Sequence, residues 1–390
     1  MGIPLADHPE KMIPENTYDV AIAGGGLAGL TLAIQLRMKG HSVILFEKER
    51  YPFHRVCGEY ISLESLGFLK SIGFDPAELE CPVISNLIVS APDGTLLKQK
   101  LPLGGFGISR YSLDQRLARI AKDKGVVLNE GDKVHEIHFK EGFFEIRSGS
   151  GTYTCLAAAG CFGKRSNLDI KWKRGFTERK PSKLNNYIGI KYHVKTNFPV
   201  DTIALHNFSD GYCGISAVEH GRYCLCYLTT ASNLERHGNS IEKMQEHILY
   251  RNPHLKSLFT TAEFLLEQPV TISQISFETK SMFEDHVLMI GDAAGMITPL
   301  CGNGMSMAMH ASKLAAKHLE KFLKHEISRD EMERSYARAW NKEFSGRLKM
   351  GRLIQSLFGK PAITNIFIRA MKPFPFLVRA LIRKTHGQPF

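Results

Sequence analysis

The sequence has 390 residues, of which 43% are hydrophobic and 23% charged, and a formal net charge of +11. These values are typical of a globular protein of two or three domains, which can bury a large core without disulfides. They exclude the disordered and disulfide-scaffold classes. The membrane-spanning class is excluded as well, because no stretch approaches the roughly 18 apolar residues of a membrane helix. Met1–Thr17 lacks the apolar core of a signal peptide, and the eight scattered cysteines form no C-x-x-C pair. We therefore expect a cytoplasmic protein with reduced thiols and no metal site.

The first predicted element is a β-α-β unit. Tyr18–Ala23 is an apolar strand, and Leu27–Lys39 is helical in composition and ends at Gly40. Ser42–Glu47 is a second strand, so the unit spans about 30 residues. The turn at 24–29 reads G-G-G-L-A-G, which fits the G-x-G-x-x-G pattern in its required place between strand and helix.

This turn predicts a dinucleotide site. Gly24 permits the tight turn, Gly26 lets the backbone approach a pyrophosphate, and Gly29 lets the helix pack on the strand. The helix start at Leu27 and Ala28 offers free N–H groups and a positive dipole end to phosphates. Glu47, followed by Lys48, ends the second strand, where an acid accepts hydrogen bonds from the adenosine ribose. The pattern alone does not choose between NAD and FAD, and an ordinary strand-to-helix turn is the alternative.

The middle of the chain predicts a second, β-rich layer. Ile84–Lys100 reads as short strands with a turn at Asp93-Gly94, and Ser112–Lys124 reads as a helix. The remaining predicted elements are strands within Val126–Arg147, Tyr187–Val194, Cys213–Val218, Arg222–Thr229 and Val287–Ile290, and helices at Ile241–His254, Ser306–His325 and Arg329–Lys349.

A second glycine-rich stretch follows the strand at Val287–Ile290. It reads G-D-A-A-G at 291–295, then Pro299, then G-N-G-M at 302–305 at the start of a long helix. Asp292 is placed to accept bonds from the ribityl hydroxyls of a flavin, although a helix cap is the commoner role of such an aspartate. Gly302 and Gly304 leave N–H groups accessible to a flat ring, and the helix start favours the negative charge of a reduced flavin.

Together, these two motifs resemble those of group A flavoprotein monooxygenases, geranylgeranyl reductases and flavin-dependent halogenases. A third stretch agrees, namely Arg110-x-x-x-Asp114-x-x-Leu117 followed by Val126 and Val134. The resemblance covers roughly residues 18 to 325 and implies FAD as the cofactor, with Arg110 near the flavin and Val134 beside the adenine. The expected cofactor-binding residues are Gly24, Gly26, Leu27, Ala28, Gly29, Glu47, Lys48, Arg55, Arg110, Val134, Gly291, Asp292, Pro299, Gly302, Asn303, Gly304 and Met305.

The chain departs from two of these families. The hydroxylases resemble one another in a G-A-D-G-x-x-S stretch, and here Gly160–Ser166 holds Phe162 in place of the aspartate. That change puts direct reduction by NADPH in doubt, so NAD(P)H is only a candidate electron donor. The halogenases resemble one another in a W-x-W-x-I-P motif that is missing here. Gly58-Glu59 resembles their G-E pair, but only over these two residues.

The reductases agree better. Arg55-Val56-Cys57-Gly58 resembles their basic-x-C-G stretch, and 210–221 resembles their substrate-sheet motif without its bulky aromatics. Cys57 is the candidate catalytic residue, as a thiol that donates a proton to an alkene, and the alternative is a small buried hydrophobe. Cys301 has the same ambiguity. His54 is a candidate base or a surface histidine, and Arg55 a pyrophosphate ligand or a solvated charge.

The C-terminal tail is basic. Residues 341–390 hold ten basic residues and one acid, Glu343, so they carry nine of the eleven net charges. Apolar and aromatic residues alternate with these charges, and Pro361, Pro373 and Pro375 divide the tail into short helices. Two interpretations stay open. In the first, the tail lies on the anionic surface at the inner face of a membrane; in the second, it packs on the core with its charges solvated. Nucleic-acid binding has no supporting motif.

The predicted fold is α/β, with a Rossmann-like βαβ domain of the glutathione-reductase type, a mostly antiparallel β-sheet domain and C-terminal helices. The predicted boundaries are 15–80, 105–168 and 280–325 for a discontinuous FAD-binding domain, 81–104 and 169–279 for the substrate domain, and 326–390 for the basic tail. The predicted function is FAD-dependent alkene reduction or O₂-dependent hydroxylation of a hydrophobic, lipid-, isoprenoid- or polyketide-like molecule. The alternatives are a non-catalytic flavin-binding redox sensor at a membrane surface, an NAD-linked dehydrogenase and a halogenase.

Overall fold

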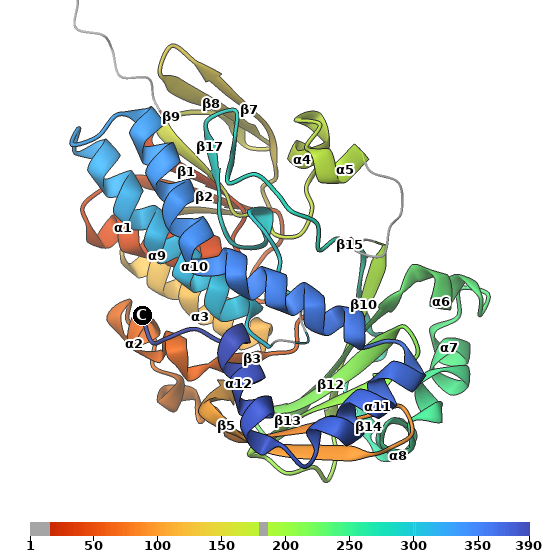
Figure 1. Cartoon of the computed structure of the whole chain (residues 1–390). Coiled ribbons are helices and arrows are strands. Elements are labelled where there is room, and N and C mark those ends of the chain that lie inside the picture. Colours follow the sequence, from red (N-terminus) through yellow and green to blue (C-terminus); the bar gives the residue numbers. More distant parts are fainter. Residues whose placement is uncertain (1–15, 179–185, 299, 301) are drawn as a thin grey trace, which may run out of the picture.

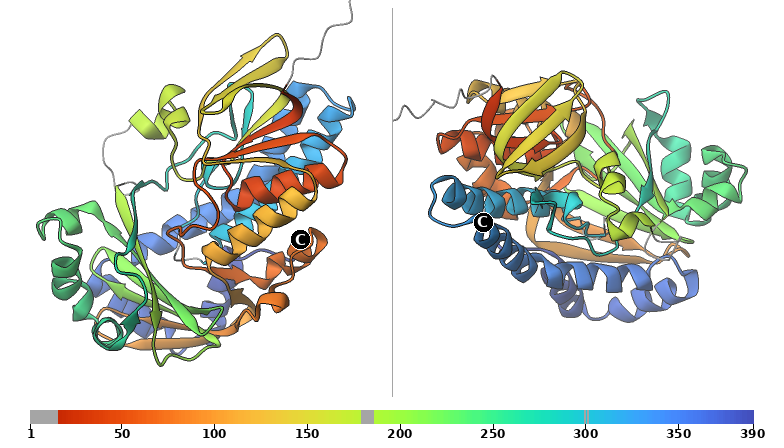
Figure 2. Two further views of the ribbon diagram at one scale, coloured as in Figure 1. Left: turned by 180° about the vertical axis from the view of Figure 1, so that it is seen from behind. Right: turned by 90° about the horizontal axis from the view of Figure 1, so that it is seen from above.

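Two β-sheets and a set of long helices make up the computed structural model, which describes residues 16–178, 186–298, 300 and 302–390 (Figure 1). The first sheet lies beside the long helices of the N- and C-terminal thirds of the chain, and the second forms the opposite half of the molecule (Figure 2). The predicted combination of a Rossmann-like layer, a mostly antiparallel sheet and C-terminal helices is confirmed.

The first sheet has a parallel centre, in the order β17-β9-β1-β2-β6. β1 lies in the middle, with Val20 opposite Val43 on one side and Ala157 on the other. β16 extends one edge and the β7–β8 hairpin joins β9, both antiparallel. The strands are β1 (Thr17–Ala23), β2 (Val43–Glu47), β6 (Val127–Glu130), β7 (Val134–Lys140), β8 (Phe143–Ser148), β9 (Gly151–Gly160), β16 (Phe283–Glu284) and β17 (Val287–Met289).

The second sheet runs in the order β14-β10-β13-β12-β11-β4-β5-β3, with β15 also paired to β10. Its pairs are antiparallel except for β11 and β4. β3 and the end of β5 belong to this sheet although they lie within the ranges assigned above to the FAD-binding domain. The strands are β3 (Tyr60–Ser62), β4 (Val83–Ser90), β5 (Leu96–Gly107), β10 (Tyr187–Lys195), β11 (Thr202–Phe208), β12 (Gly211–Val218), β13 (Arg222–Thr230), β14 (Glu263–Phe264) and β15 (Val270–Ile275).

The long helices form a layer along the first sheet, in which α1 packs against α3 and α9, and α9 against α10 (Figure 1). They are α1 (Leu27–Met38), α3 (Arg110–Asp123), α9 (Gly304–Leu323) and α10 (Arg329–Leu357). The shorter helices are η1 (Leu63–Ser65), α2 (Leu66–Ser71), η2 (Pro76–Leu79), α4 (Asn167–Lys171), α5 (Gly175–Glu178), α6 (Ala231–Glu235), α7 (Ile241–His247), η3 (Leu249–Arg251), α8 (Pro253–Thr261), η4 (Gly291–Ala293), α11 (Pro361–Met371) and α12 (Pro375–Thr385).

The single helix predicted at 241–254 is wrong. The chain instead makes α7, a 3-10 turn and α8. The helical run is interrupted at Asn252, whose backbone is extended. Asn252 caps the start of α8, because its side chain accepts a hydrogen bond from the His254 N–H. Pro253 then occupies the first turn of α8, where its missing N–H costs nothing.

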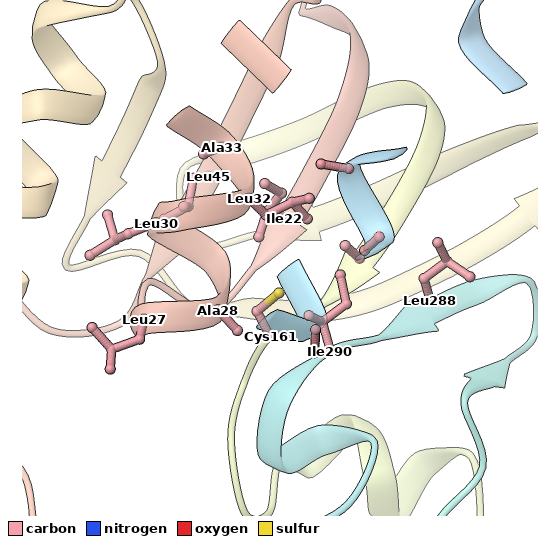
Figure 3. Close-up of a cluster of buried hydrophobic side chains, with 14 of the residues drawn as sticks. Ile22, Leu27, Ala28, Leu30, Leu32, Ala33, Leu45, Cys161, Leu288 and Ile290 are labelled. Carbon is pink, nitrogen blue, oxygen red and sulfur yellow. The ribbon is translucent and has the colours of Figure 1, made fainter. Parts of the chain in front are cut away.

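The largest core surrounds the β-α-β unit. Figure 3 shows part of it, where Ile22 of β1, Leu30 and Leu32 of α1, Leu45 of β2 and Leu288 of β17 gather in one cluster. All five side chains are fully buried. This core anchors the glycine-rich turn that follows β1, because both flanking elements are fixed by burial.

The tail turns away from the first sheet. α10 begins beside α9 and reaches α11 and α12, and these two pack on β5 of the second sheet (Figure 1). Ile368 and Val378 are buried there against Val89 and Leu97. One face of the tail therefore packs on the core, as the second of the two interpretations predicts. Within residues 16–178 and 186–390, apart from 299 and 301, no helix is long and apolar enough to cross a bilayer.

Candidate functional site

A cavity of about 980 Å³ lies between the two sheets. This volume is at the upper end of the range found for small-molecule and cofactor sites. One part of its wall consists of the two glycine-rich stretches at 24–28 and 302–305. Another part consists of apolar side chains from the second sheet and from the tail. A single cavity thus joins a polar, glycine-lined end to an apolar end.

The first glycine-rich turn needs its glycines for three different reasons. Gly24 has a φ of +110°, and a Cβ there would lie 2.5 Å from the carbonyl oxygen of Cys161. A Cβ on Gly29 would lie 2.0 Å from the Gly24 carbonyl oxygen, so this glycine lets α1 pack on the turn. A Cβ on Gly26 would meet only Arg110, with Nη2 at 3.8 Å, and would project into the cavity. Gly26 is therefore the position that a bound group would approach.

Two helix starts face the same cavity without a side-chain cap. α1 begins after Gly26 and α9 after Asn303, and neither residue donates or accepts a capping bond at that end. The first residues of both helices line the cavity, namely Leu27, Ala28, Gly304 and Met305. Their N–H groups and the positive ends of the two helices are thus directed at a ligand site, which suits a pyrophosphate and a flavin ring.

Glu47 holds the first turn in place. It is buried at the end of β2, and its carboxylate accepts hydrogen bonds from the N–H groups of Gly25 (2.9 Å) and Glu49 (3.1 Å). Arg55 Nη2 also donates to this carboxylate, at 2.7 Å, so about one of its roughly four acceptor sites remains for the predicted ribose contact. Lys48 and Val134 line the same end of the cavity.

Arg55 and Arg110 share one buried acid. Arg55 Nη2 lies 2.7 Å from Glu47 and its Nε 3.1 Å from Asp114. Arg110 donates two hydrogen bonds to Asp114, of 2.8 and 2.7 Å. Burial disfavours the charge of Arg110, but Asp114 outweighs this and raises the pKa of the guanidinium. Both arginines line the cavity and are paired with buried acids, so Arg55 is not the solvated charge considered above.

Asp292 is the most available acid at the glycine-lined end. It lies in η4 after Gly291, which has a φ of +66°, and it lines the cavity. No hydrogen bond to its carboxylate is found among the described residues, and the residue before η4 is Ile290, so Asp292 is not a helix cap. Its backbone carbonyl accepts a bond from buried Lys280, at 2.9 Å, and burial lowers the pKa of that lysine to about 8. The predicted residues Pro299 and Cys301 lie outside the described residues.

A buried polar cluster under the loop 55–59 was not predicted from the sequence. Glu59, with a φ of +55°, is fully buried, and its carboxylate accepts bonds from Lys191 Nζ, from the Arg110 N–H (2.7 Å) and from His193 Nε2 (2.6 Å). Burial favours the neutral acid, but the charge of Lys191 and the bond from His193 prevail and lower the pKa of Glu59 to about 2. The cluster therefore fixes the loop between the two sheets.

Cys57 lies in this fixed loop and lines the cavity. Its carbonyl accepts a bond from the Cys224 thiol of β13, with the sulfur at 3.2 Å, while Arg55 two residues earlier pairs with Glu47 of β2. Cys57 is only half-buried, unlike a core cysteine. His54 stacks on Tyr111 with ring centroids 4.7 Å apart, and burial and nearby Lys191 lower its pKa to about 4.

Phe162 stands where the hydroxylases have an aspartate, and it lines the cavity. Its ring lies 6.4 Å from that of Trp172 in a tilted contact. An aromatic ring in place of a carboxylate removes a hydrogen-bond acceptor from this part of the wall. The position is therefore apolar, as the sequence indicates.

The far end of the cavity is apolar on both sides. The second sheet contributes one wall and the tail helices contribute the other. The side chains are Leu87, Val89, Leu97, Leu101, Ile203 and Leu205 from the sheet, and Phe367, Ile368, Met371, Val378, Leu381 and Ile382 from the tail. A long apolar ligand would be buried by residues that are far apart in the chain.

The chain matches the family model "FAD binding domain" over residues 17–339. It is 24% identical over 380 residues to conditioned medium factor receptor 1 of Dictyostelium discoideum, covering 88% of this chain and 71% of that protein. It is 24% identical over 398 residues to digeranylgeranylglycerophospholipid reductase 2 of Methanothermobacter thermautotrophicus, covering 93% and 98%.

Among solved structures, a flavin-dependent brominase superposes with a TM-score of 0.77 at 19% identity, covering 95% of this chain and 93% of that chain. This likeness concerns the fold. The family match spans both glycine-rich stretches and the arginine stretch between them, and the residues at the cavity wall fit the cofactor. The chain therefore belongs to the FAD binding domain family and is an FAD-dependent oxidoreductase.

Proposed function

We propose that the protein reduces carbon–carbon double bonds of a hydrophobic, isoprenoid- or lipid-like molecule. The observation that carries this proposal is the position of Cys57, in a loop tied to β2 on one side and to β13 on the other. The cavity at this loop joins the glycine-lined end to the apolar end. A reductase of an isoprenoid lipid is among the relatives that match nearly the whole chain.

The residues divide the work between binding and proton supply. Bound FAD supplies the two-electron redox chemistry. The apolar walls bury the substrate chain and exclude water, which contributes about 25 cal/mol for each Å² of apolar surface removed from water. Cys57, which lines the cavity, is assigned the role of the general acid that gives a proton to the second carbon of the reduced bond. His54 is neutral at neutral pH because its pKa is about 4, so it adds no positive charge here.

The test uses the purified, FAD-loaded protein, reduced without oxygen and mixed with an archaeal-type lipid that carries geranylgeranyl chains. The expected product gains two hydrogens per reduced double bond, measured by mass spectrometry. A Cys57→Ser variant should lose about a hundredfold in rate, in line with the loss of a general acid, and keep its FAD. Cys226→Ser, at another thiol of the same cavity, is the matched control and should stay active. No hydrogen gain with isoprenoid lipids would refute the proposal.

O₂-dependent hydroxylation is the second candidate, and the water-excluding apolar walls favour it, because reactive oxygen intermediates need a dry site. NAD(P)H is the electron donor that this reaction would require. The flavin absorbance of the protein, followed during anaerobic addition of NADPH without substrate, separates the two. Rapid bleaching, followed by oxygen incorporation into a hydrophobic substrate in air, would favour hydroxylation. A persistent flavin band would direct the search to a separate electron-donating protein and favour alkene reduction.

A further inference from the structure

The tail helices α11 and α12 have two apolar faces, and only one of them packs on the protein. The inner face includes Ile368 and Val378, which are buried against the second sheet. The outer face leaves Ile366 with 69% and Phe376 with 65% of its surface exposed. Ile363, Phe374 and Leu377 are also exposed on these helices and their connection. Exposed large apolar residues at this density on two consecutive helices indicate an interaction surface.

All charged residues of this outer surface are basic. No acidic residue follows Glu343. The exposed cations of the two helices and their connection are Arg369, Lys372, Arg379, Arg383 and Lys384. One of them, Arg369, is paired with Asp93 of the neighbouring β4–β5 turn at 2.7 Å. The remaining charge favours an anionic partner, and the aromatic and aliphatic side chains beside it favour an apolar layer beneath that charge.

We propose that this surface, which we call the tail face and define as the exposed residues of 360–384, binds the surface of an anionic lipid bilayer. Amphipathic helices with basic and aromatic residues lie in the interface with their apolar side chains among the acyl chains. Each basic residue near such a surface adds about 1 kcal/mol of attraction. An anionic bilayer offers both properties at once, because its charged surface covers an apolar layer that takes up side chains such as Ile366, Phe376 and Leu377.

The inner sides of the same two helices line the apolar end of the cavity. Phe367 and Met371 of α11 and Leu381 and Ile382 of α12 contribute to that wall. The tail face and the cavity wall are therefore opposite sides of one helical layer, which Figure 2 shows along an outer edge of the molecule. Resting on the proposed function, the apolar end of the cavity that would hold the substrate therefore lies directly behind the layer that faces the bilayer.

Vesicle flotation of the full-length, FAD-loaded protein tests the tail face without any turnover. Vesicles of phosphatidylcholine alone are compared with vesicles that contain one-third phosphatidylglycerol, at low and high salt. We expect binding to the anionic vesicles only, weakened by salt. Lys372→Gln combined with Arg379→Gln should lower the partition constant by roughly thirtyfold, and Phe376→Ser combined with Leu377→Ser should lower it by at least about tenfold. Because the altered side chains are exposed, the thermal midpoint should not change.

Two controls match these changes away from the tail face. Val200→Ser removes an apolar side chain that is 58% exposed, and Lys140→Gln removes a cation that is 82% exposed. Both should bind vesicles like the unaltered protein. Equal binding to neutral and anionic vesicles, no binding to either, or an equal loss with the controls would each overturn the proposal. So would displacement by polyglutamate as effectively as by soluble anionic lipid, which would indicate an acidic protein partner.

A fluorescent side chain gives an independent readout. Phe376→Trp places an indole on the tail face, and its emission is obtained by subtracting that of the unaltered protein, which has two tryptophans. A blue shift with anionic vesicles and quenching by brominated acyl chains are expected. An unchanged spectrum would contradict insertion even if flotation were positive. If vesicle binding holds but isoprenoid lipids are not reduced, the proposed function fails and the membrane proposal stands.

Discussion

Glu59 and Lys191 form an ion pair in which both side chains are completely excluded from solvent. The two residues come from the loop before β3 and from β10, so the pair joins the loop that carries Cys57 to the second sheet. Charges buried to this extent are stable only when paired and hydrogen-bonded. His193 and the Arg110 N–H complete the set of donors around the carboxylate.

Removal of one partner of this pair should strongly destabilise the protein. Glu59→Gln leaves Lys191 as a buried, uncompensated cation, and we expect the free energy of unfolding to fall by roughly 3–5 kcal/mol in urea titrations. Adding Lys191→Met to that variant should restore a large part of the loss, because no charge is then buried alone. Glu145→Gln, at an exposed acid, is the control. A Glu59→Gln protein as stable as the unaltered one would show that the pair contributes nothing.

Two glycines only three residues apart should respond differently to alanine. At Gly26 a Cβ meets only the end of the Arg110 side chain, so Gly26→Ala should fold with a nearly unchanged thermal midpoint. The added methyl projects into the cavity, and FAD occupancy, measured as flavin absorbance per protein, should fall by at least about tenfold. At Gly29 a Cβ would collide with the Gly24 backbone, so Gly29→Ala should fail to give soluble protein. Full FAD content in Gly26→Ala would contradict the predicted approach of the pyrophosphate.

Asp292→Ala should lose FAD and keep its fold. The carboxylate lines the cavity, and no hydrogen bond to it is found in the described part of the chain, so its removal leaves no partner unsatisfied there. A charge-assisted bond to a ribityl hydroxyl is worth about 1.5–3 kcal/mol, which predicts a roughly tenfold to hundredfold higher Kd for FAD in a fluorescence titration. Asp123→Ala, an exposed acid on α3, should leave the Kd unchanged.

A buried histidine should make stability fall in mild acid. Burial lowers the pKa of His206 to about 3, from an ordinary value of 6.5. Between these two values the unfolded chain binds a proton that the folded chain does not, so stability decreases as pH falls through this window and is unaffected above it. The contribution is about 1.4 kcal/mol per pH unit. The free energy of unfolding, measured by urea titration at each pH from 7 to 4, should therefore fall less steeply with decreasing pH in His206→Gln. In His135→Gln, which changes an exposed histidine, this pH dependence should be the same as in the unaltered protein.

The parts predicted well from the sequence are those whose signals are local. The strand, turn and helix at 17–38 and the helix at 304–323 follow from apolar runs, glycines and helix starts within a few residues of one another. These local signals also lead to one cavity, because both glycine-rich stretches follow parallel strands of one sheet. The resemblance to flavoproteins rests on the same stretches, so the family follows from the sequence without knowledge of any contact.

The buried cluster is not predicted from the sequence because Glu59 is separated from Lys191 and His193 by more than a hundred residues. Lys191 and His193 alternate with apolar residues in β10, a pattern typical of a strand with one wet face. The wet face is instead covered by the loop at Glu59, and the register that sets His193 opposite Cys224 depends on pairing with β13. The spacing of apolar and basic residues in the tail likewise indicates that α11 and α12 are amphipathic. It does not indicate whether their apolar side chains contact the second sheet or another surface.

The position of β17 in the first sheet has a consequence for how the protein is made. β17 pairs with β9, with Leu288 opposite Ala159, so this edge of the parallel sheet is closed by a strand synthesised more than a hundred residues after its neighbour. While the ribosome translates most of the second sheet, β8 already pairs with the beginning of β9, but the end of β9 at Ala159 and Gly160 has no neighbour on that side, and unpaired strand edges promote aggregation. This end of the sheet therefore stays open during synthesis until Val287–Met289 has emerged from the ribosome.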